Sequence, residues 1–297
     1  MKTFEMKDLG KIHYCLGIEF TQDVKMKSIS MSQKKFIDEI LDRFNMKDCK
    51  TVKTPLDPST KLSKDISPGN DDERKEMLDY PYQNLIGSLM YLAVSTRPDI
   101  SYAVSALSQF NTCYSKEHWN AAKRVLRYLK GTRDLKLTFK QSDGGVIGFA
   151  DADWGANLDD RKSYTGFVFL YAGAAVTWEA RKQKTVALST TEAEYMAMSD
   201  ATIEAIHLKR LLNEISEIND SVKIYCYNQG ALKLARNPVF HNRTKHIDIR
   251  YHFIREALEN CEIKLDYVAT ESMVADVLTK GLFTPKHKLC VHELGLM

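Results

Sequence analysis

The sequence lacks any long apolar run and any cysteine pairing pattern. No stretch of its 297 residues approaches the ~18 consecutive apolar residues of a membrane span. Residues 1–5 are mixed and charged, so no signal peptide is expected. The six cysteines are scattered without a CxxC pair, which favours reduced thiols over a disulfide framework or a zinc site. We therefore expect an intracellular protein, in the cytoplasm or nucleus, with no membrane partner.

The sequence also lacks a strong charge of either sign. The net charge is +3 and the pI is near 8.4, a mildly basic balance that does not by itself imply nucleic acid. The chain is 44% hydrophobic and 27% charged, as is ordinary for a globular protein. Its length leaves room for one large domain or two.

Composition divides the chain into four parts. Residues 1–54 hold short extended pieces and a helix with helical apolar spacing from Phe36 to Phe44. Residues 55–79 hold three prolines and few apolar residues, as is typical of a linker. Residues 80–140 are predicted to be helical, and residues 145–285 alternate strands with helices.

The last helix expected in the third part, over 119–129, has a basic side. It carries four cations there: Lys123, Arg124, Arg127 and Lys130. A basic helix face is usually solvated, but it can also follow nucleic-acid phosphates. The sequence leaves both interpretations open.

The fourth part opens with an apolar run that ends in two carboxylates. Residues 146–149 fit a buried strand, and Asp151 and Asp153 follow one residue apart, so they share one face near its end. Solvated turn residues would show the same pattern. A rigid strand end is, however, also a place where a metal or acid–base site can be built.

The order of elements after this strand predicts an α/β fold. Two further strands at hairpin spacing are followed by a long helix, a strand, two helices, a strand and a final helix opening at Met273. Strands that begin antiparallel and then acquire helical crossovers form a mixed sheet with flanking helices. Thr191 and Glu194 fit a capping box of the long helix, and Asp276 lies near the start of the final one.

Several long motifs in this order resemble copia-type retrotransposon Pol polyproteins. Their ribonuclease H motifs are matched by FADADWG at 149–155 with DRKS at 160–163, ALSTTEAEY at 187–195, TKHIDIRYHFIRE at 244–256 and ADVLTK at 275–280. The end of the reverse transcriptase palm is matched by FEMKDLG at 4–10 and LGI at 16–18, and the thumb-to-connection region by LIGSLMYL at 85–92 and TRPDI at 96–100. The resemblance covers essentially the whole chain.

The resemblance implies a fold and a chemistry. The fold would be a ribonuclease H-like mixed five-stranded sheet, preceded by a partial palm and thumb and a helical connection. The activity would be cleavage of the RNA strand of an RNA–DNA hybrid with two Mg²⁺ ions. Asp151, Glu194 and Asp276 would be the catalytic metal ligands, and Arg243, Lys245 and His246 would lie in a polar loop that meets the substrate.

Two departures limit this expectation. The family has a fourth carboxylate in a Cys-Asp-Asn-Gln run, whereas this chain has Tyr227 in that place. A neutral phenol cannot replace a carboxylate as a Mg²⁺ ligand, so impaired cleavage is expected. The Asp-Asp pairs at 71–72 and 159–160 lie in polar segments, so no polymerase site is expected.

These observations leave two functions open, and they do not separate the second from a decayed element fragment with no role. The chain is either a ribonuclease H-like protein acting on hybrids, or an inactive protein that binds nucleic acid or intact retroelement proteins.

Overall fold

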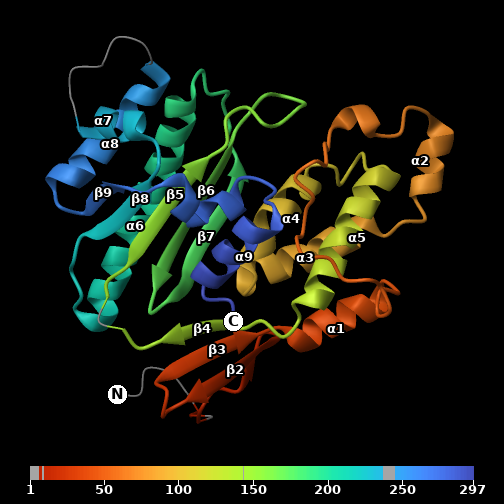
Figure 1. Cartoon of the computed structure of the whole chain (residues 1–297), viewed down its shortest axis with the longest axis horizontal. Helices are drawn as coiled ribbons and strands as arrows, with labels where there is room; N and C mark the ends of the chain where they lie inside the picture. The colour runs from red at the N-terminus through yellow and green to blue at the C-terminus, as the bar shows by residue number, and fades with distance from the viewer. Residues whose placement is uncertain (1–6, 9, 143, 237–244) are drawn as a thin grey trace.

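A computed structural model describes residues 7–8, 10–142, 144–236 and 245–297 (Figure 1). Its main sheet contains β5 (Ile147–Ala152), β6 (Tyr164–Tyr171), β7 (Ala174–Lys182), β8 (Val222–Cys226) and β9 (Ile263–Tyr267). The strand order is β7-β6-β5-β8-β9. The first three strands are antiparallel neighbours, and β8 and β9 run parallel to β5. The predicted α/β, ribonuclease H-like class with a mixed five-stranded sheet is confirmed.

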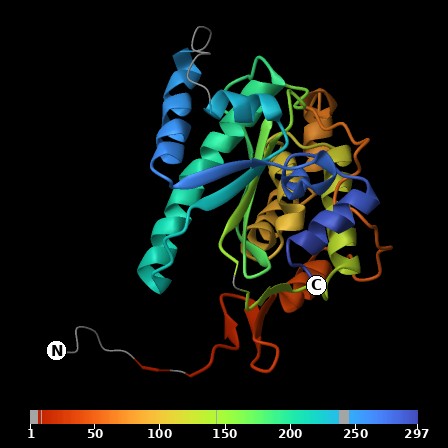
Figure 2. The same ribbon diagram turned by 60° about the vertical axis from the view of Figure 1, so that its left-hand side comes forward.

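Helices cover both faces of this sheet. On one face lie α6 (Thr190–Ser216), α7 (Gln229–Arg236) and α8 (Lys245–Glu259), packed on an apolar core with Ile224 at its centre. On the other face lie the 3₁₀ turn η4 (Val274–Leu278) and α9 (Thr284–Glu293). Figure 2 shows α6 and α9 on opposite sides of the strands. No helix among the described residues is long and apolar enough to cross a membrane.

A second sheet joins distant parts of the chain. It contains β1 (Tyr14–Cys15), β2 (Ile18–Asp23), β3 (Ser28–Ser32) and β4 (Leu137–Lys140), all antiparallel in that order. Because β4 follows the helical part, the N-terminal strands are completed by residues about a hundred positions later.

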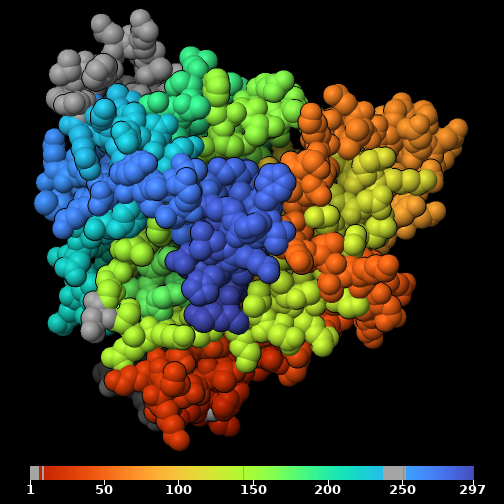
Figure 3. Space-filling model, in the orientation of Figure 1, coloured from red at the N-terminus to blue at the C-terminus, as the bar shows by residue number. Residues whose placement is uncertain are grey.

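The helical layer contains α1 (Lys34–Arg43), α2 (Asp71–Met77), α3 (Tyr82–Ser95), α4 (Ser101–Ser108) and α5 (Lys116–Gly131), with the 3₁₀ turns η1 (Lys64–Ile66) and η2 (Pro98–Ile100). Leu56 and Met77, from the expected linker, are buried in the same core as Ile40 of α1 and Leu89 of α3. The segment 55–79 is therefore packed onto the helices, and the division into four domains stays a prediction. In Figure 3 the C-terminal residues lie between the sheet and this layer.

Cations on the basic side of α5 form hydrogen bonds with an earlier segment of the same chain. Arg127 Nε donates to the carbonyl of Lys50 at 2.7 Å, and Lys130 Nζ to that of Cys49 at 2.9 Å. Arg124 donates to the Thr54 hydroxyl at 3.1 Å. These three cations hold the segment before the expected linker, which gives the basic side of α5 a role within the chain.

A buried ion pair connects the helical layer to the C-terminal helix. Arg97 donates to both carboxylate oxygens of Asp99, at 2.9 and 2.7 Å, and the Tyr128 hydroxyl donates to Asp99 at 2.6 Å. Burial opposes the charge on Asp99, but Arg97 outweighs burial and holds the pKa of the carboxyl below its usual value. The His287 ring of α9 packs edge-on against Tyr128.

We expect Asp99→Ala to lower the free energy of unfolding by about 3–5 kcal/mol, because it leaves the Arg97 guanidinium buried without its counter-ion. Urea unfolding measures this change. Asp134→Ala is the matched control, since Asp134 pairs with Lys34 at 2.7 Å on the surface, where solvent screens the pair, so its loss should be far smaller than that of Asp99→Ala. Equal losses in the two variants would contradict the prediction.

Candidate active site

Three elements bring the predicted carboxylates together. Asp151 lies near the end of β5, Glu194 in α6 and Asp276 in η4, and their exposed fractions are 0%, 1% and 2%. The negative charge of Asp276 raises the pKa of Asp151, and the negative charge of Asp151 raises the pKa of Glu194, so the three carboxylates lie close together. Asp153, just past β5, is also buried and accepts a hydrogen bond from the backbone N–H of Tyr164.

Glu194 is not a capping residue of α6. Helix α6 begins at Thr190, and its N-cap is Ser189, whose side chain accepts from the Glu192 N–H at 3.2 Å. Glu192 in turn accepts from the Leu188 N–H at 2.9 Å. The predicted capping box of Thr191 and Glu194 is therefore wrong, because the helix starts before Thr191. Glu194 instead points inward, with one oxygen 3.9 Å from the Cys226 sulfur.

A close approach between β6 and the C-terminal segment places Asp276. The final helix predicted from Met273 is wrong, because η4 ends at Leu278 and α9 begins only at Thr284. Gly166 is the β6 partner of Asp151, and a Cβ at Gly166 would lie 2.7 Å from the Thr279 methyl. Glycine at this position lets η4 reach the carboxylates.

Two residues of the site, Thr279 and Lys280, were not identified as site residues from the sequence. The Thr279 hydroxyl donates to Asp151. Lys280 Nζ lies 2.6 Å from Asp276 Oδ1 and 3.6 Å from Asp151 Oδ2. Their spacing from Asp276, three and four residues along the chain, is the signal that could have indicated them. Lys286 adds a second cation, 3.3 Å from Asp276 Oδ2.

Burial dominates the protonation of these groups. It raises the pKa of Asp151 to about 6 and that of Asp153 to about 7, and the negative charge of a neighbouring aspartate adds to both shifts. The pKa of Glu194 is raised well above its usual value by burial and then by Asp151. For Lys280, burial lowers the pKa, but Asp151 and Asp276 outweigh it, so the ammonium is stabilised.

Tyr227 lies just past β8, half-buried beside these acids. Burial raises its pKa, followed by the charges of Glu194 and Asp151, so the phenol stays neutral at physiological pH. Its hydroxyl is near enough to Glu194 to interact with the carboxylate. Oε1 of Glu194 has no hydrogen-bond partner among the described residues.

These residues supply three of the four carboxylates of the family's two-ion magnesium site, with Tyr227 in the fourth place. Buried oxygens of Asp151 and Glu194 lack hydrogen-bond partners in the described part of the chain, as metal ligands would. Yet no three acidic, histidine or cysteine side chains among the described residues are arranged to hold an ion. The Lys280 ammonium instead contacts Asp151 and Asp276, and Tyr227 contributes no charge.

The predicted substrate-binding residues fall at the edge of the described chain. Lys245 and His246 belong to the first turn of α8 rather than to a loop, because that helix begins at Lys245. Their side chains, and Arg243 altogether, lie outside the described residues. Arg250 ties α8 to α6 by donating to the carbonyl of Met196 at 3.1 Å and to Asp200 at 2.8 Å.

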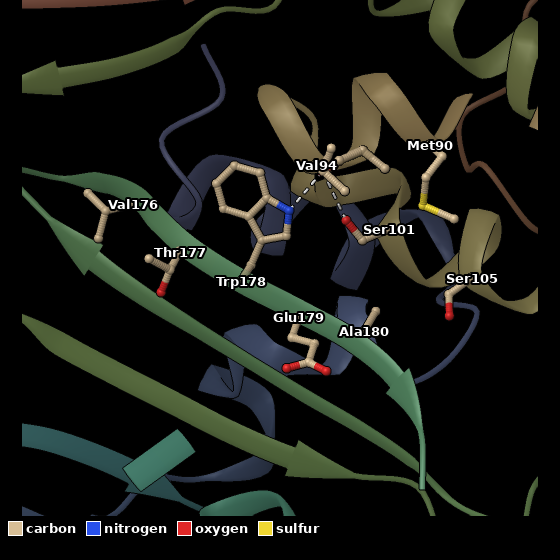
Figure 4. A pocket seen from close by; sticks show the side chains of 10 residues that line it. Met90, Val94, Ser101, Ser105, Val176, Thr177, Trp178, Glu179 and Ala180 are labelled. Atoms are coloured by element: carbon tan, nitrogen blue, oxygen red, sulfur yellow. Dashed lines mark hydrogen bonds between the residues drawn. The ribbon is translucent and has the colours of Figure 1, made fainter. Parts of the chain in front are cut away.

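A cavity of about 420 Å³ lies away from the carboxylates, between α3, α4 and β7 (Figure 4). Trp178 crosses it and donates from its indole to the Ala93 carbonyl at 2.8 Å. Its acidic residue, Glu179, lies 2.5 Å from Arg181. The lining shares no residue with the carboxylate site.

The chain matches known proteins over nearly all of its length. A family model described as reverse transcriptase (RNA-dependent DNA polymerase) matches residues 1–58. The retrovirus-related Pol polyprotein from transposon TNT 1-94 of Nicotiana tabacum is 43% identical over 99% of this chain, and that from transposon RE1 of Arabidopsis thaliana is 40% identical over 99%. The chain belongs to the copia-type Pol polyprotein family.

This copia-type chain spans about a fifth of the length of these relatives, 22% and 20% respectively. Among solved structures, it is similar to LC11-RNase H1, isolated from compost by a metagenomic approach. That likeness has 14% identity and a TM-score of 0.36, and it covers 45% of this chain and 91% of the other.

The raised aspartate pKa values predict a pH effect on stability. Between about pH 4 and pH 7 the native state holds protons on Asp151 and Asp153 that the unfolded state has released. The free energy of unfolding contributed by these groups therefore falls as pH rises through this window. Relative to the natural chain, Asp153→Asn should gain about 2 kcal/mol in going from pH 5 to pH 7.5.

Urea unfolding in chelator at the two pH values measures this gain. Asp57→Asn is a control, because hydrogen bonds from Ser59 hold the pKa of Asp57 below its usual value, and thus below this window. An equal effect of Asp153→Asn at both pH values would contradict the prediction.

Proposed function

We propose that this copia-type chain binds RNA–DNA hybrids on a ribonuclease H-like surface and cleaves the RNA strand slowly or not at all. One observation carries the proposal. Tyr227 stands beside Glu194 and Asp151 where a fourth carboxylate would stand in its family. The fold and three acidic positions remain, and the fourth negative charge is gone.

The remaining residues define what the site can do. In the family's chemistry, Asp151, Glu194 and Asp276 would hold Mg²⁺, which would supply an activated water and charge stabilisation for the leaving oxygen. Here the neutral phenol adds no ligand charge, and Lys280 compensates Asp151 and Asp276 internally. Cleavage is therefore expected to fall by roughly 100-fold or more compared with a site that has all four carboxylates.

Polymerisation is not part of the proposal. Asp71 and Asp72 start α2, where each pairs with a basic residue three positions later. Asp160 lies 2.9 Å from Lys182 Nζ in an ion pair, and Asp159 accepts from the Lys64 N–H at 2.8 Å. Both aspartate pairs thus have structural uses.

A second candidate function is binding to intact retroelement proteins without catalysis. The N-terminal sheet favours it, because several apolar side chains of that sheet are exposed. Tyr14, Leu16 and Val24 expose 58%, 82% and 74% of their surface. Apolar patches of this kind are typical of surfaces that another protein covers.

A cleavage assay on a labelled RNA–DNA hybrid in Mg²⁺ tests the proposed function. We expect Tyr227→Asp to cut at least roughly 100-fold faster than the natural chain, because it supplies the fourth carboxylate. Adding Asp151→Asn to that variant should abolish the gain. Tyr227→Phe is the matched control, since it removes the hydroxyl without adding charge, and it should leave cleavage low.

Two outcomes would contradict the proposal. The natural chain could cut as fast as Tyr227→Asp, which would show that the fourth carboxylate is dispensable. Alternatively, a folded Tyr227→Asp variant could bind the hybrid and still fail to cut, which would show that Tyr227 is not the missing ligand.

A further inference from the structure

One large aromatic side chain is exposed at the edge of the carboxylate site. Trp154 directly follows Asp153 and exposes 56% of its surface, whereas Trp119 is buried and Trp178 is half-buried. Neither the fold nor the carboxylate chemistry accounts for this exposure.

The indole is held in place although its surface is open. Its Nε1 donates to the carbonyl of Ala187 at 3.1 Å, in the loop that leads into α6. On either side of it, Asp153 accepts from the Tyr164 N–H and Gly155 N–H donates to the Ser163 hydroxyl at 3.0 Å. A ring fixed in this way loses little conformational entropy when a ligand covers it.

Two cations lie in the loops that carry and bind this ring. Arg161 lies in the loop that follows Trp154, and Lys184 lies in the loop whose Ala187 carbonyl binds the indole. Both are exposed, and neither forms an ion pair with a residue that the structure describes. By contrast, the nearby Lys182 is paired with Asp160 at 2.9 Å.

A fixed aromatic face with unpaired cations in the same two loops matches the chemistry of a nucleic-acid strand. Aromatic rings pack on sugars and bases, and cations contact the phosphates between them. In an RNA–DNA hybrid the paired bases are already stacked, and the sugars line a wide, shallow minor groove. A flat ring at the edge of the site is therefore suited to a sugar of the bound hybrid.

We propose that Trp154 is a positioning residue that packs against a sugar of a bound RNA–DNA hybrid, with Arg161 and Lys184 contacting the adjacent phosphates. This inference rests on the proposed function, since it concerns the same substrate. It adds the surface that fixes where the strand lies relative to Asp151.

The test measures binding of a fluorescent RNA–DNA hybrid to the full chain by anisotropy in chelator, where no cleavage intervenes. Trp154→Ala should weaken binding roughly fivefold to tenfold, and Trp154→Phe, which keeps an aromatic face, by less than about threefold. Leu78→Ala should leave binding unchanged, because Leu78 is also apolar and exposed, at 78%, but lies at the end of α2 in the helical layer. Arg161→Ala with Lys184→Ala should reduce the slope of log K against log salt by about 1–2.

Tryptophan emission gives a second readout that a merely structural role would not move. Covering an exposed indole shifts its emission to shorter wavelength, so an unlabelled hybrid should cause a shift in the natural chain that Trp154→Phe lacks. Suppose that the hybrid binds the natural chain, that Trp154→Ala binds it equally well, and that the natural chain shows no emission shift. Only this inference is then overturned. If the natural chain does not bind the hybrid, both this inference and the proposed function are overturned.

Discussion

The site depends on the burial of several carboxylates with few cations to balance them. Asp151, Asp153, Glu194 and Asp276 are each at most 9% exposed, and removing a carboxylate from water costs several kcal/mol unless it is paired or protonated. The chain uses both solutions. Lys280 pairs with Asp151 and Asp276, and burial raises the pKa of Asp153 and Glu194 so that their neutral forms are favoured.

Tyr227 is consistent with this constraint. A fourth carboxylate beside Glu194 would add negative charge to a cluster that already protonates in part. The neutral phenol adds none, and its ring packs with the apolar residues on the α9 side of the sheet. The substitution that is expected to remove metal binding therefore also lowers the electrostatic cost of folding without a metal.

Local patterns predicted most of the ribonuclease H-like part. The alternation and spacing of apolar residues indicated the strands from β5 to β9, because each pattern lies within one element, but not their order in the sheet. Asp151 could be placed because it ends an apolar strand. Asp276 could be located in the sequence by its motif, but not in a 3₁₀ turn, because the approach of η4 depends on Gly166 in another strand.

Contacts between distant segments could not be predicted. The cations of α5 were assigned to solvent or phosphate, but they bind backbone carbonyls about 80 positions earlier. The segment 55–79 has the composition of a linker and is nevertheless packed, since Leu56 and Met77 enter the helical core. In both cases the sequence shows the residues but does not show which distant residues they contact.

We propose that Tyr227 prevents the site from binding divalent ions. Thermal unfolding of the natural chain and of Tyr227→Asp, each in chelator and in excess Mg²⁺, tests this proposal, because an ion that binds the native state raises the unfolding temperature. We expect a rise of several degrees for Tyr227→Asp and of less than about 1 °C for the natural chain. An equal rise in both chains would show that Tyr227 does not prevent ion binding.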